Sequence, residues 1–248
     1  MKRTIAIVAG GDSSELVVSL RSAQGLYSFI DKERYNLYIV EMEGHRWEVV
    51  LPDGSKTPID RNDFSFMENG EKKQFDFAYI TIHGTPGENG ILQGYFDLLG
   101  IPYSSCNVLV SAMTFNKFTC NQYLKGFGIR VAESLILRKG FEITDEEVIN
   151  KIGLPCFIKP NAGGSSFGVT KVKTKEDIQP AIEKAFEESD EVMIEAFMKG
   201  TEITCGCYKT SDKEVVWSQI QRRVTGNHTC PPARRYSRAC TSAHLGHL

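Results

Sequence analysis

The fold of this chain is decided by the stretch Pro155-Cys-Phe-Ile-Lys-Pro-Asn-Ala-Gly-Gly-Ser-Ser-Phe-Gly-Val-Thr-Lys-Val172, in which a lysine and a glycine- and serine-rich loop lie between two short apolar runs. Glycines let the backbone turn tightly and bring its N–H groups close to an anion. Ser165 and Ser166 add hydroxyl donors, and Lys159 adds a positive charge. These features are typical of a loop that binds phosphate.

The order of the features is more informative than their composition. In a P-loop, a strand leads into a loop that ends in Gly-Lys-Ser/Thr, and a helix follows. Here Lys159 precedes the loop, and a second β-branched run from Val169 to Val172 follows it. The pattern therefore predicts a β-hairpin that closes as a flap over a nucleotide. From the loop alone, an ordinary hairpin turn with an exposed lysine is an equally good interpretation.

The composition is that of an ordinary globular protein, with 248 residues, a formal net charge of −2, 41% hydrophobic residues and 24% charged residues. This length suits about two domains. The near-neutral balance gives no reason to expect nucleic acid or an anionic membrane as a partner. No apolar run reaches the length of a membrane span. The stretch that ends at Gly10 is too short for a signal peptide, so we interpret it as a buried strand.

The seven cysteines are an odd number and lack the paired spacing of a metal site. Cys205 and Cys207 alternate on a predicted strand and would share a face, which leaves a metal site open there. Buried free thiols are the better interpretation. Unpaired cysteines predict a reducing cytoplasm as the compartment.

The first part of the chain alternates between strands and helices. Strands are predicted over residues 4–9, 35–40 and 77–82, helices over 15–30 and 91–99, and a polar excursion around Pro52-Asp-Gly54. Ser13 or Ser14 would cap the first helix. The alternation predicts a small parallel α/β domain over residues 1–103. Ligands bind such sheets at the carboxyl ends of the strands, where the loops at Gly10 and His83 would lie.

The second part, residues 104–217, mixes antiparallel strands and helices and is α+β in character. Besides the flap hairpin, helices are predicted over 116–125, 145–152 and the segment that begins near Ile178. Gly126 and Gly153 would close the first two of these helices. Strands are predicted over 131–137, 192–196 and 202–208, the last two around a turn at Lys199-Gly200.

Four motifs follow one another along the chain: His83-Gly-Thr-Pro-Gly-Glu-Asn-Gly-Ile-Leu-Gln-Gly94, Asn116-Lys117, Cys156-Phe-Ile-Lys-Pro160 with Gly164-Ser-Ser-Phe-Gly168, and Ile194-Glu-Ala-Phe-Met-Lys-Gly-Thr-Glu202. In this order and spacing they resemble the D-alanine–D-alanine ligase family, from residue 1 to about residue 217. The resemblance implies an ATP-grasp fold, in which two α+β jaws hold ATP. It also implies a cytoplasmic enzyme of peptidoglycan synthesis that joins two D-alanines through an acylphosphate.

The resemblance implies an ATP site built from the later motifs. Lys117 and Lys159 would contact the phosphates, and the backbone at Gly164 with Ser165 and Ser166 would close over them. For the nucleoside, the implied residues are Glu195 at the adenine amino group, the backbone of Phe197 and Met198 at the purine edge, and Glu202 at the ribose hydroxyls. Taken singly, Glu195 and Glu202 are better explained as solvated strand residues. Their joint spacing favours the functional interpretation.

The resemblance also implies a site for D-alanine. Glu15 would hold the ammonium of the first D-alanine, His83 would assist at its carboxylate, and Glu15, Ser165 and Ser166 would be the catalytic residues. One departure weakens this assignment. The family usually has Glu-His-Glu-Val-Ser near the first helix, whereas this chain has Glu15-Leu-Val-Val-Ser19. Relatives are homodimers, and the resemblance extends that expectation to this chain.

The family continues with an Arg-x-Asp strand and a Glu-x-Asn motif that bind two magnesium or manganese ions, and neither motif is found here. Residues 218–248 are instead basic and without periodicity, which predicts a disordered tail. Gly226-Asn-His-Thr-Cys-Pro-Pro232 can be encoded by codons that give Glu-Ile-Thr-Pro-Ala-Arg when read one nucleotide later, a string typical of the family. We therefore hypothesise a deletion near Trp217 and a frameshift. The gene sequence tests this, because codons that cannot encode that string would exclude it.

Two other functions stay open at this point. The chain could be a D-alanine–D-lactate type of ligase, or a nucleotide-binding fragment without catalytic activity. A dehydrogenase is disfavoured, because Gly10-Gly11-Asp12 lacks the Gly-x-Gly-x-x-Gly fingerprint.

We expect the 248-residue chain to release little or no phosphate from ATP in the presence of D-alanine and magnesium. The reason is that the acidic metal ligands that would compensate the triphosphate charge are not found in its sequence. A coupled phosphate-release assay beside a full-length family member measures this. Turnover close to that of the full-length enzyme would show that the expectation is wrong.

Overall fold

Strand β1 (Arg3–Gly10) is the centre of the first sheet, and the residues from Ile5 to Gly10 are all buried. A continuous β-branched and alanine run is what a strand needs when both of its faces are covered. In the computed structural model, β1 pairs in parallel with β2 (Tyr35–Glu43) on one side and β7 (Phe77–Ile80) on the other. The predicted strands are confirmed. The structure describes residues 2–164, 167–209, 215–217 and 221–222.

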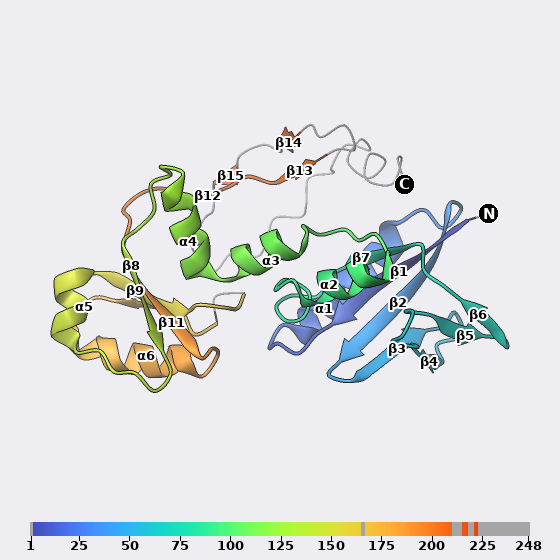
Figure 1. Cartoon of the computed structure of the whole chain (residues 1–248), viewed down its shortest axis with the longest axis horizontal. Coiled ribbons are helices and arrows are strands. Elements are labelled where there is room, and N and C mark those ends of the chain that lie inside the picture. The colour runs from blue at the N-terminus through green and yellow to red at the C-terminus, as the bar shows by residue number, and fades with distance from the viewer. Residues whose placement is uncertain (1, 165–166, 210–214, 218–220, 223–248) are drawn as a thin grey trace. The chain divides into compact units, whose positions relative to one another are not determined.

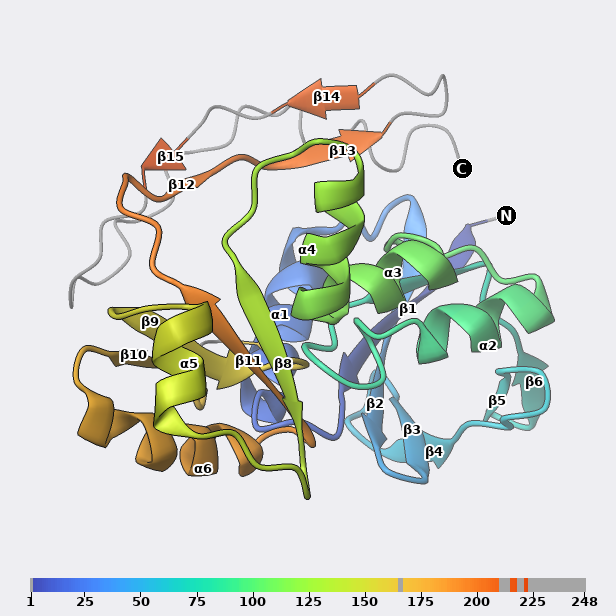
Figure 2. The same ribbon diagram turned by 60° about the vertical axis from the view of Figure 1, so that its left-hand side comes forward.

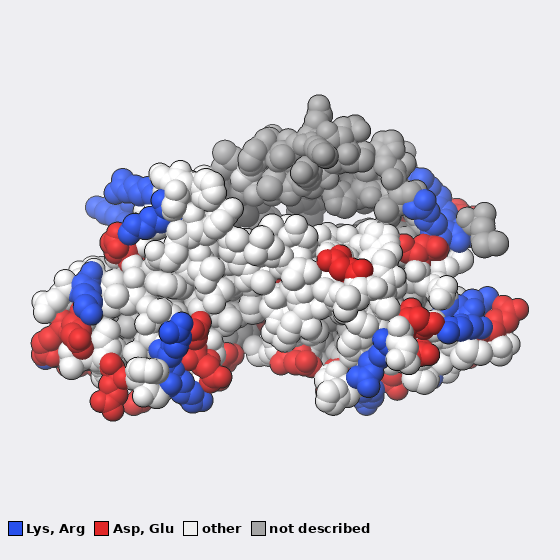
Figure 3. Space-filling view, viewed as in Figure 1, with Lys and Arg blue, Asp and Glu red and all other residues white. Residues whose placement is uncertain are grey.

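The chain divides into two units, residues 1–197 and 198–248 (Figure 1). In the described residues, no helix combines the length and the apolar character needed to cross a membrane. On the face in Figure 3, basic and acidic side chains of the described residues are interspersed, as the near-neutral composition predicts.

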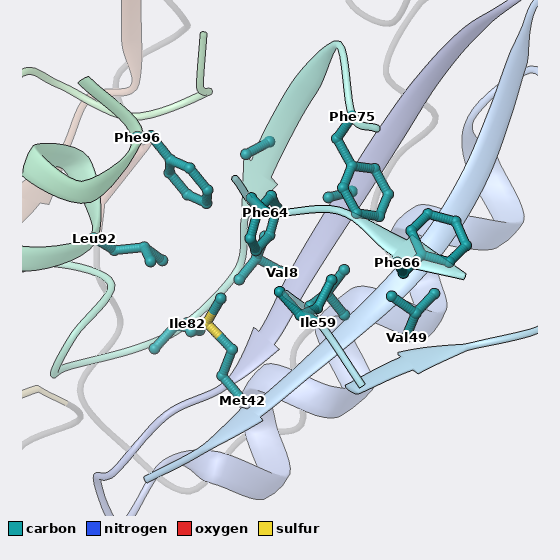
Figure 4. Packing of buried hydrophobic residues seen from close by; sticks show 13 residues of the cluster. Val8, Met42, Val49, Ile59, Phe64, Phe66, Phe75, Ile82, Leu92 and Phe96 are labelled. Carbon is teal, nitrogen blue, oxygen red and sulfur yellow. The ribbon is translucent and has the colours of Figure 1, made fainter. Parts of the chain in front are cut away.

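Helices cover both faces of the first sheet. Helix α1 (Leu16–Phe29) packs Ala23 against Ile7, Ala9 and Ile39, whereas α2 (Ile91–Leu99) packs on the opposite face. That opposite face holds the larger cluster, in which four buried phenylalanine rings lie among aliphatic side chains (Figure 4). The rings are those of Phe64, Phe66, Phe75 and Phe96.

The polar excursion between β2 and β7 contains structure that the sequence reading missed. Strands β3 (Arg46–Val50) and β4 (Lys56–Pro58) extend the sheet with antiparallel pairing, so its order is β4-β3-β2-β1-β7 and it is mixed rather than parallel. Strands β5 (Phe66–Glu68) and β6 (Glu71–Lys73) form a separate hairpin. Its turn residues Asn69 and Gly70 both have positive φ, as a two-residue Asn-Gly turn requires. These strands were not predicted because they are short and their charged, half-exposed residues resemble those of a loop.

The second sheet is antiparallel throughout, with the order β10-β9-β11-β8, and it contains the predicted hairpin (Figure 2). Helices α5 and α6 bury its apolar side, including Ile158, Val172, Val192 and Ile194. A capping box at Thr144 and Glu147 begins α5, and Gly153 follows its end at a φ of 82°. The elements are β8 (Ser134–Arg138), α5 (Asp145–Lys151), β9 (Cys156–Pro160), β10 (Thr170–Val172), the 3₁₀ helix η1 (Lys175–Asp177), α6 (Ile178–Phe186) and β11 (Glu191–Ala196).

Two consecutive helices follow the first sheet, α3 (Val108–Phe115) and α4 (Lys117–Gly126). Each begins at an asparagine whose side chain accepts a first-turn N–H, Asn107 for α3 and Asn116 for α4. The sequence reading missed α3. It also ended α4 too early, because Gly126 belongs to the helix and the glycine with positive φ is Gly128.

The second unit contains two short antiparallel pairs in its described residues. Strand β12 (Ile203–Thr204) pairs with β15 (Gln221–Arg222), and β13 (Cys207–Lys209) pairs with β14 (Val215–Trp217). The prediction of one strand over 202–208 beside β11 is therefore wrong, since Cys205-Gly206 divides it. Cys205 is exposed rather than buried. Of the predicted tail, residues 218–220 and 223–248 lie outside the described residues.

We expect Phe64→Ala to lower the free energy of unfolding by about 3–5 kcal/mol, because Phe64 is fully buried and its ring contacts Phe75 and Phe96. Urea unfolding followed by circular dichroism measures the change. Phe29→Ala is the control, since that ring is 78% exposed, and it should cost far less. Equal losses in the two variants would contradict the assignment of this core.

Candidate functional site

The loops after β1 and β7 meet at the carboxyl ends of these strands, as predicted. The Asp12 N–H donates to the Thr85 carbonyl at 2.9 Å, and the Ser13 hydroxyl donates to the His83 carbonyl at 2.8 Å. Gly11 allows the approach, because a Cβ there would lie 2.6 Å from the Ile82 side chain. The predicted capping role of Ser13 or Ser14 is wrong, since the N-cap residue of α1 is Glu15 and the helix has no side-chain cap. Ser13 is used to join the two loops instead.

Glu15 is only 3% exposed and lies next to the flap loop, by which we mean residues 161–169 between β9 and β10. A Cβ built on Gly164 would come 2.4 Å from Glu15 Oε2. A larger residue at position 164 would therefore have to displace the Glu15 carboxylate. His83 is half-buried at the start of the neighbouring loop. The structure thus brings together Glu15 and Gly164, residues 149 positions apart in the sequence.

Strands β9 and β11 each have an apolar face and a functional face. Ile158 and Ile194 point into the core with α5 and α6, so their sequence neighbours point to the other side. On that side Lys159 forms an ion pair with Glu195, and their side chains are only 21% and 17% exposed. Asn121 of α4 donates to the other carboxylate oxygen of Glu195 at 3.3 Å. Both oxygens of this carboxylate therefore have partners.

Lys117, at the start of α4, reaches the flap loop from the opposite direction. Its Nζ donates to the Gly163 carbonyl at 2.8 Å and lies 3.4 Å from the Asn161 carbonyl. Burial lowers the pKa of Lys117, and the charge of Lys159 lowers it further, while Glu88 opposes the shift. Within the described residues, no carboxylate lies within ion-pair distance of Lys117. An anion placed between Lys117 and Lys159 would stabilise both charges.

An aromatic edge begins at Phe157, which lies on the same side of β9 as Lys159. The rings of Phe157 and Phe197 lie 6.0 Å apart, and Lys171 Nζ lies 3.5 Å from the centroid of the Phe197 ring. Phe197 is 36% exposed, so the edge is open to solvent on one side. Met198 and Glu202 are exposed and belong to the second unit. Ser165 and Ser166, predicted for the flap, lie outside the described residues.

The sequence reading missed three residues of this site: Asn121, Asn161 and Lys171. Each is a single polar residue in a helix, at a strand end or in a strand, and no local pattern distinguishes it from a solvated side chain. Their positions follow only from the pairing of β9 with β10 and β11 and from the contact of α4 with Glu195. As for metals, no group of three or more metal-binding side chains occurs in the part of the chain that the structure describes. The described residues therefore do not fit a magnesium site, and we assign no step to a metal.

Comparison with known proteins identifies the family. The family model described as D-ala D-ala ligase N-terminus matches residues 4–106, and the model described as D-ala D-ala ligase C-terminus matches residues 123–232. The chain is 76% identical over 217 residues to a D-alanine–D-alanine ligase of Bacteroides fragilis, an alignment that covers 88% of this chain and 67% of that relative. The chain belongs to the D-alanine–D-alanine ligase family. A Parabacteroides distasonis ligase is 66% identical over 227 residues, or 92% of this chain and 68% of the relative.

Solved structures agree with this family membership. D-alanyl-alanine synthetase A from Vibrio cholerae superposes with a TM-score of 0.80 at 30% identity, covering 96% of this chain and 73% of that one. A Bacillus anthracis D-alanine–D-alanine ligase complexed with ATP gives 0.67 at 29% identity, covering 89% and 66%. The ATP-grasp fold inferred from the motifs is therefore confirmed. The chain spans about two thirds of the length of the curated ligases it matches.

Proposed function

We propose that the functional face of β9 and β11 binds ATP and that the loops after β1 and β7 bind D-alanine. One observation carries the nucleotide assignment. Lys117 of α4 contacts the glycine-rich loop and Lys159 lies in the strand that leads into it, and burial together with their mutual repulsion lowers the pKa of Lys117. A polyphosphate would supply the missing negative charge, and the loop N–H groups would add hydrogen bonds. Gly164, Ser165 and Ser166 would close over these phosphates.

The nucleoside would lie along the aromatic edge. In this proposal Glu195 accepts a hydrogen bond from the adenine amino group, the backbone of Phe197 and Met198 contacts the purine edge, and Glu202 binds the ribose hydroxyls. The Glu195 carboxylate accepts hydrogen bonds from Lys159 and Asn121. ATP binding would therefore move Lys159 from the carboxylate toward the phosphates and leave a Glu195 oxygen for the adenine.

The reaction we propose is the ATP-dependent joining of two D-alanines. The carboxylate of the first D-alanine attacks the γ-phosphorus of ATP, which gives an acylphosphate and ADP. The amine of the second then attacks the acyl carbon, phosphate leaves, and the nitrogen loses a proton as the peptide bond forms. Glu15 would hold the first ammonium, His83 would assist at the carboxylate, and Ser165 and Ser166 would act at the transferred phosphoryl group.

Several wider assignments accompany this function. We propose domain boundaries near residues 103 and 217, a cytoplasmic location and a homodimer. Magnesium or manganese would accompany ATP in the family, but the motifs that bind it there are not found in this sequence. The acceptor we favour is D-alanine, because the curated relatives at 66–76% identity are named for that substrate. A solved relative from Enterococcus faecalis, at 28% identity and a TM-score of 0.76, is a D-Ala:D-Ser ligase, so the fold accepts other second substrates.

We expect Lys159→Met to weaken ATP binding to the chain by about 10- to 100-fold, because a charge-assisted phosphate contact is lost. Isothermal titration calorimetry with ATP measures the dissociation constant. Lys139→Met is the matched control, since this lysine is exposed at the end of β8 and pairs only loosely with Asp190 at 3.5 Å. Unchanged affinity in Lys159→Met, or an equal loss in the control, would refute the nucleotide assignment.

A further inference from the structure

Asn161 joins three elements at the point where β9 ends and the flap loop begins. It is 1% exposed. Its N–H donates to the Glu191 carbonyl at 2.8 Å, and its carbonyl accepts the Lys117 N–H at 3.0 Å. Its side-chain Oδ1 accepts the Phe118 N–H at 2.8 Å, while Nδ2 donates to Glu191 Oε2 at 2.7 Å. Each polar group of this buried residue therefore has a partner.

These contacts fix the beginning of α4. The first N–H groups of a helix have no acceptor within the helix, and here the N–H groups of Lys117 and Phe118 both end on Asn161. Glu191 anchors the other end of the connection, because Arg138 of β8 also donates to it at 2.9 Å. These charge-assisted contacts lower the pKa of Glu191, with Arg138 the larger cause and Asn161 the next. Arg138 therefore holds the Glu191 carboxylate through one oxygen, and Asn161 donates to the other.

We propose that Asn161 is a positioning residue for the nucleotide: by tying the start of α4 to Glu191, it holds the Lys117 ammonium against the flap loop. ATP affinity then depends on Asn161 through Lys117 rather than through contact with the ligand. This inference rests on the proposed function, in which Lys117 contacts phosphate. Without Asn161, the Phe118 N–H and the Glu191 carboxylate would each lose a buried partner.

The side chain at position 161 must accept from one group and donate to another. Asn161→Ala removes both functions. The double variant Asn161→Asp/Glu191→Gln keeps both contacts of the side chain. The new carboxylate at position 161 still accepts from the Phe118 N–H, and in its contact with position 191 it accepts a hydrogen bond from the new amide there instead of donating one. Asn107→Ala is the matched control, since Asn107 Oδ1 accepts the Val110 N–H at 3.0 Å at the start of α3.

The first experiment is calorimetric titration of ATP into the 248-residue chain and its variants. We expect Asn161→Ala to weaken binding about 10-fold, the exchanged double variant to recover most of the affinity, and Asn107→Ala to bind like the parent. Each variant is first checked by circular dichroism for folding. Parent-like affinity in Asn161→Ala, or an equal loss in Asn107→Ala, would overturn the proposal.

A double-mutant cycle then tests the route of the effect. If Asn161 acts by holding Lys117, Asn161→Ala causes no further loss of affinity in a chain that already carries Lys117→Met. A residue that merely stabilises the domain would instead lower affinity by the same factor in both backgrounds. Additive losses would therefore overturn the positioning role.

A readout without nucleotide separates this proposal from the proposed function. The pKa of Lys117 is followed by the pH dependence of its ¹³Cε resonance, with Lys159 and Glu88 as the charged groups that face it. In Asn161→Ala the ammonium leaves its buried position, so its pKa should rise toward the ordinary value of lysine. A parent that binds no ATP would refute the nucleotide assignment, while this shift would still support the positioning role. An unchanged titration in Asn161→Ala would overturn that role.

Discussion

The site depends on the alternation of side chains along β9 and β11. Because successive residues of a strand point to opposite faces, the burial of Ile158 and Ile194 against α5 and α6 forces Lys159 and Glu195 to the other side. Sheet pairing then brings the lysine and the glutamate together. A shift of one residue in this pairing would bury the charged side chains and expose the apolar ones. The burial of the apolar face therefore determines which residues lie on the polar face.

Desolvation sets the electrostatic character of the site. Lys117 is largely buried, and its hydrogen bonds go to carbonyl oxygens rather than to a carboxylate. Its charge is therefore poorly compensated, as its lowered pKa shows. A poorly compensated ammonium is unfavourable by itself, but it would be stabilised by a bound anion. The same reasoning explains why Glu195 is paired with Lys159, because a largely buried carboxylate needs a cation beside it.

Sequence patterns predicted the parts of the fold that have strong local signals. The buried run of β1, the helix that begins at Ile178 and the glycine-rich hairpin were all predicted correctly. The weak points were the short, charged strands β3 to β6, whose half-exposed faces resemble a loop, and helix α3, which is apolar without a clear periodicity. The Asn69-Gly70 turn was a usable signal for the β5–β6 hairpin. The prediction of one strand over 202–208 was wrong because Cys205-Gly206 divides the segment into β12 and β13.

The sequence by itself determined the family and the identity of the charged and glycine residues. Motifs of specific residue types in a fixed order can be recognised even when the contacts of their residues are unknown. The tertiary structure alone decided which of these residues meet. It placed Gly164 against Glu15, aimed Lys117 at Gly163 and made Asn161 the junction of α4, β9 and β11. The physical reason is that these contacts join residues far apart in the chain. Their distances follow from how sheets and helices pack, and no local propensity encodes them.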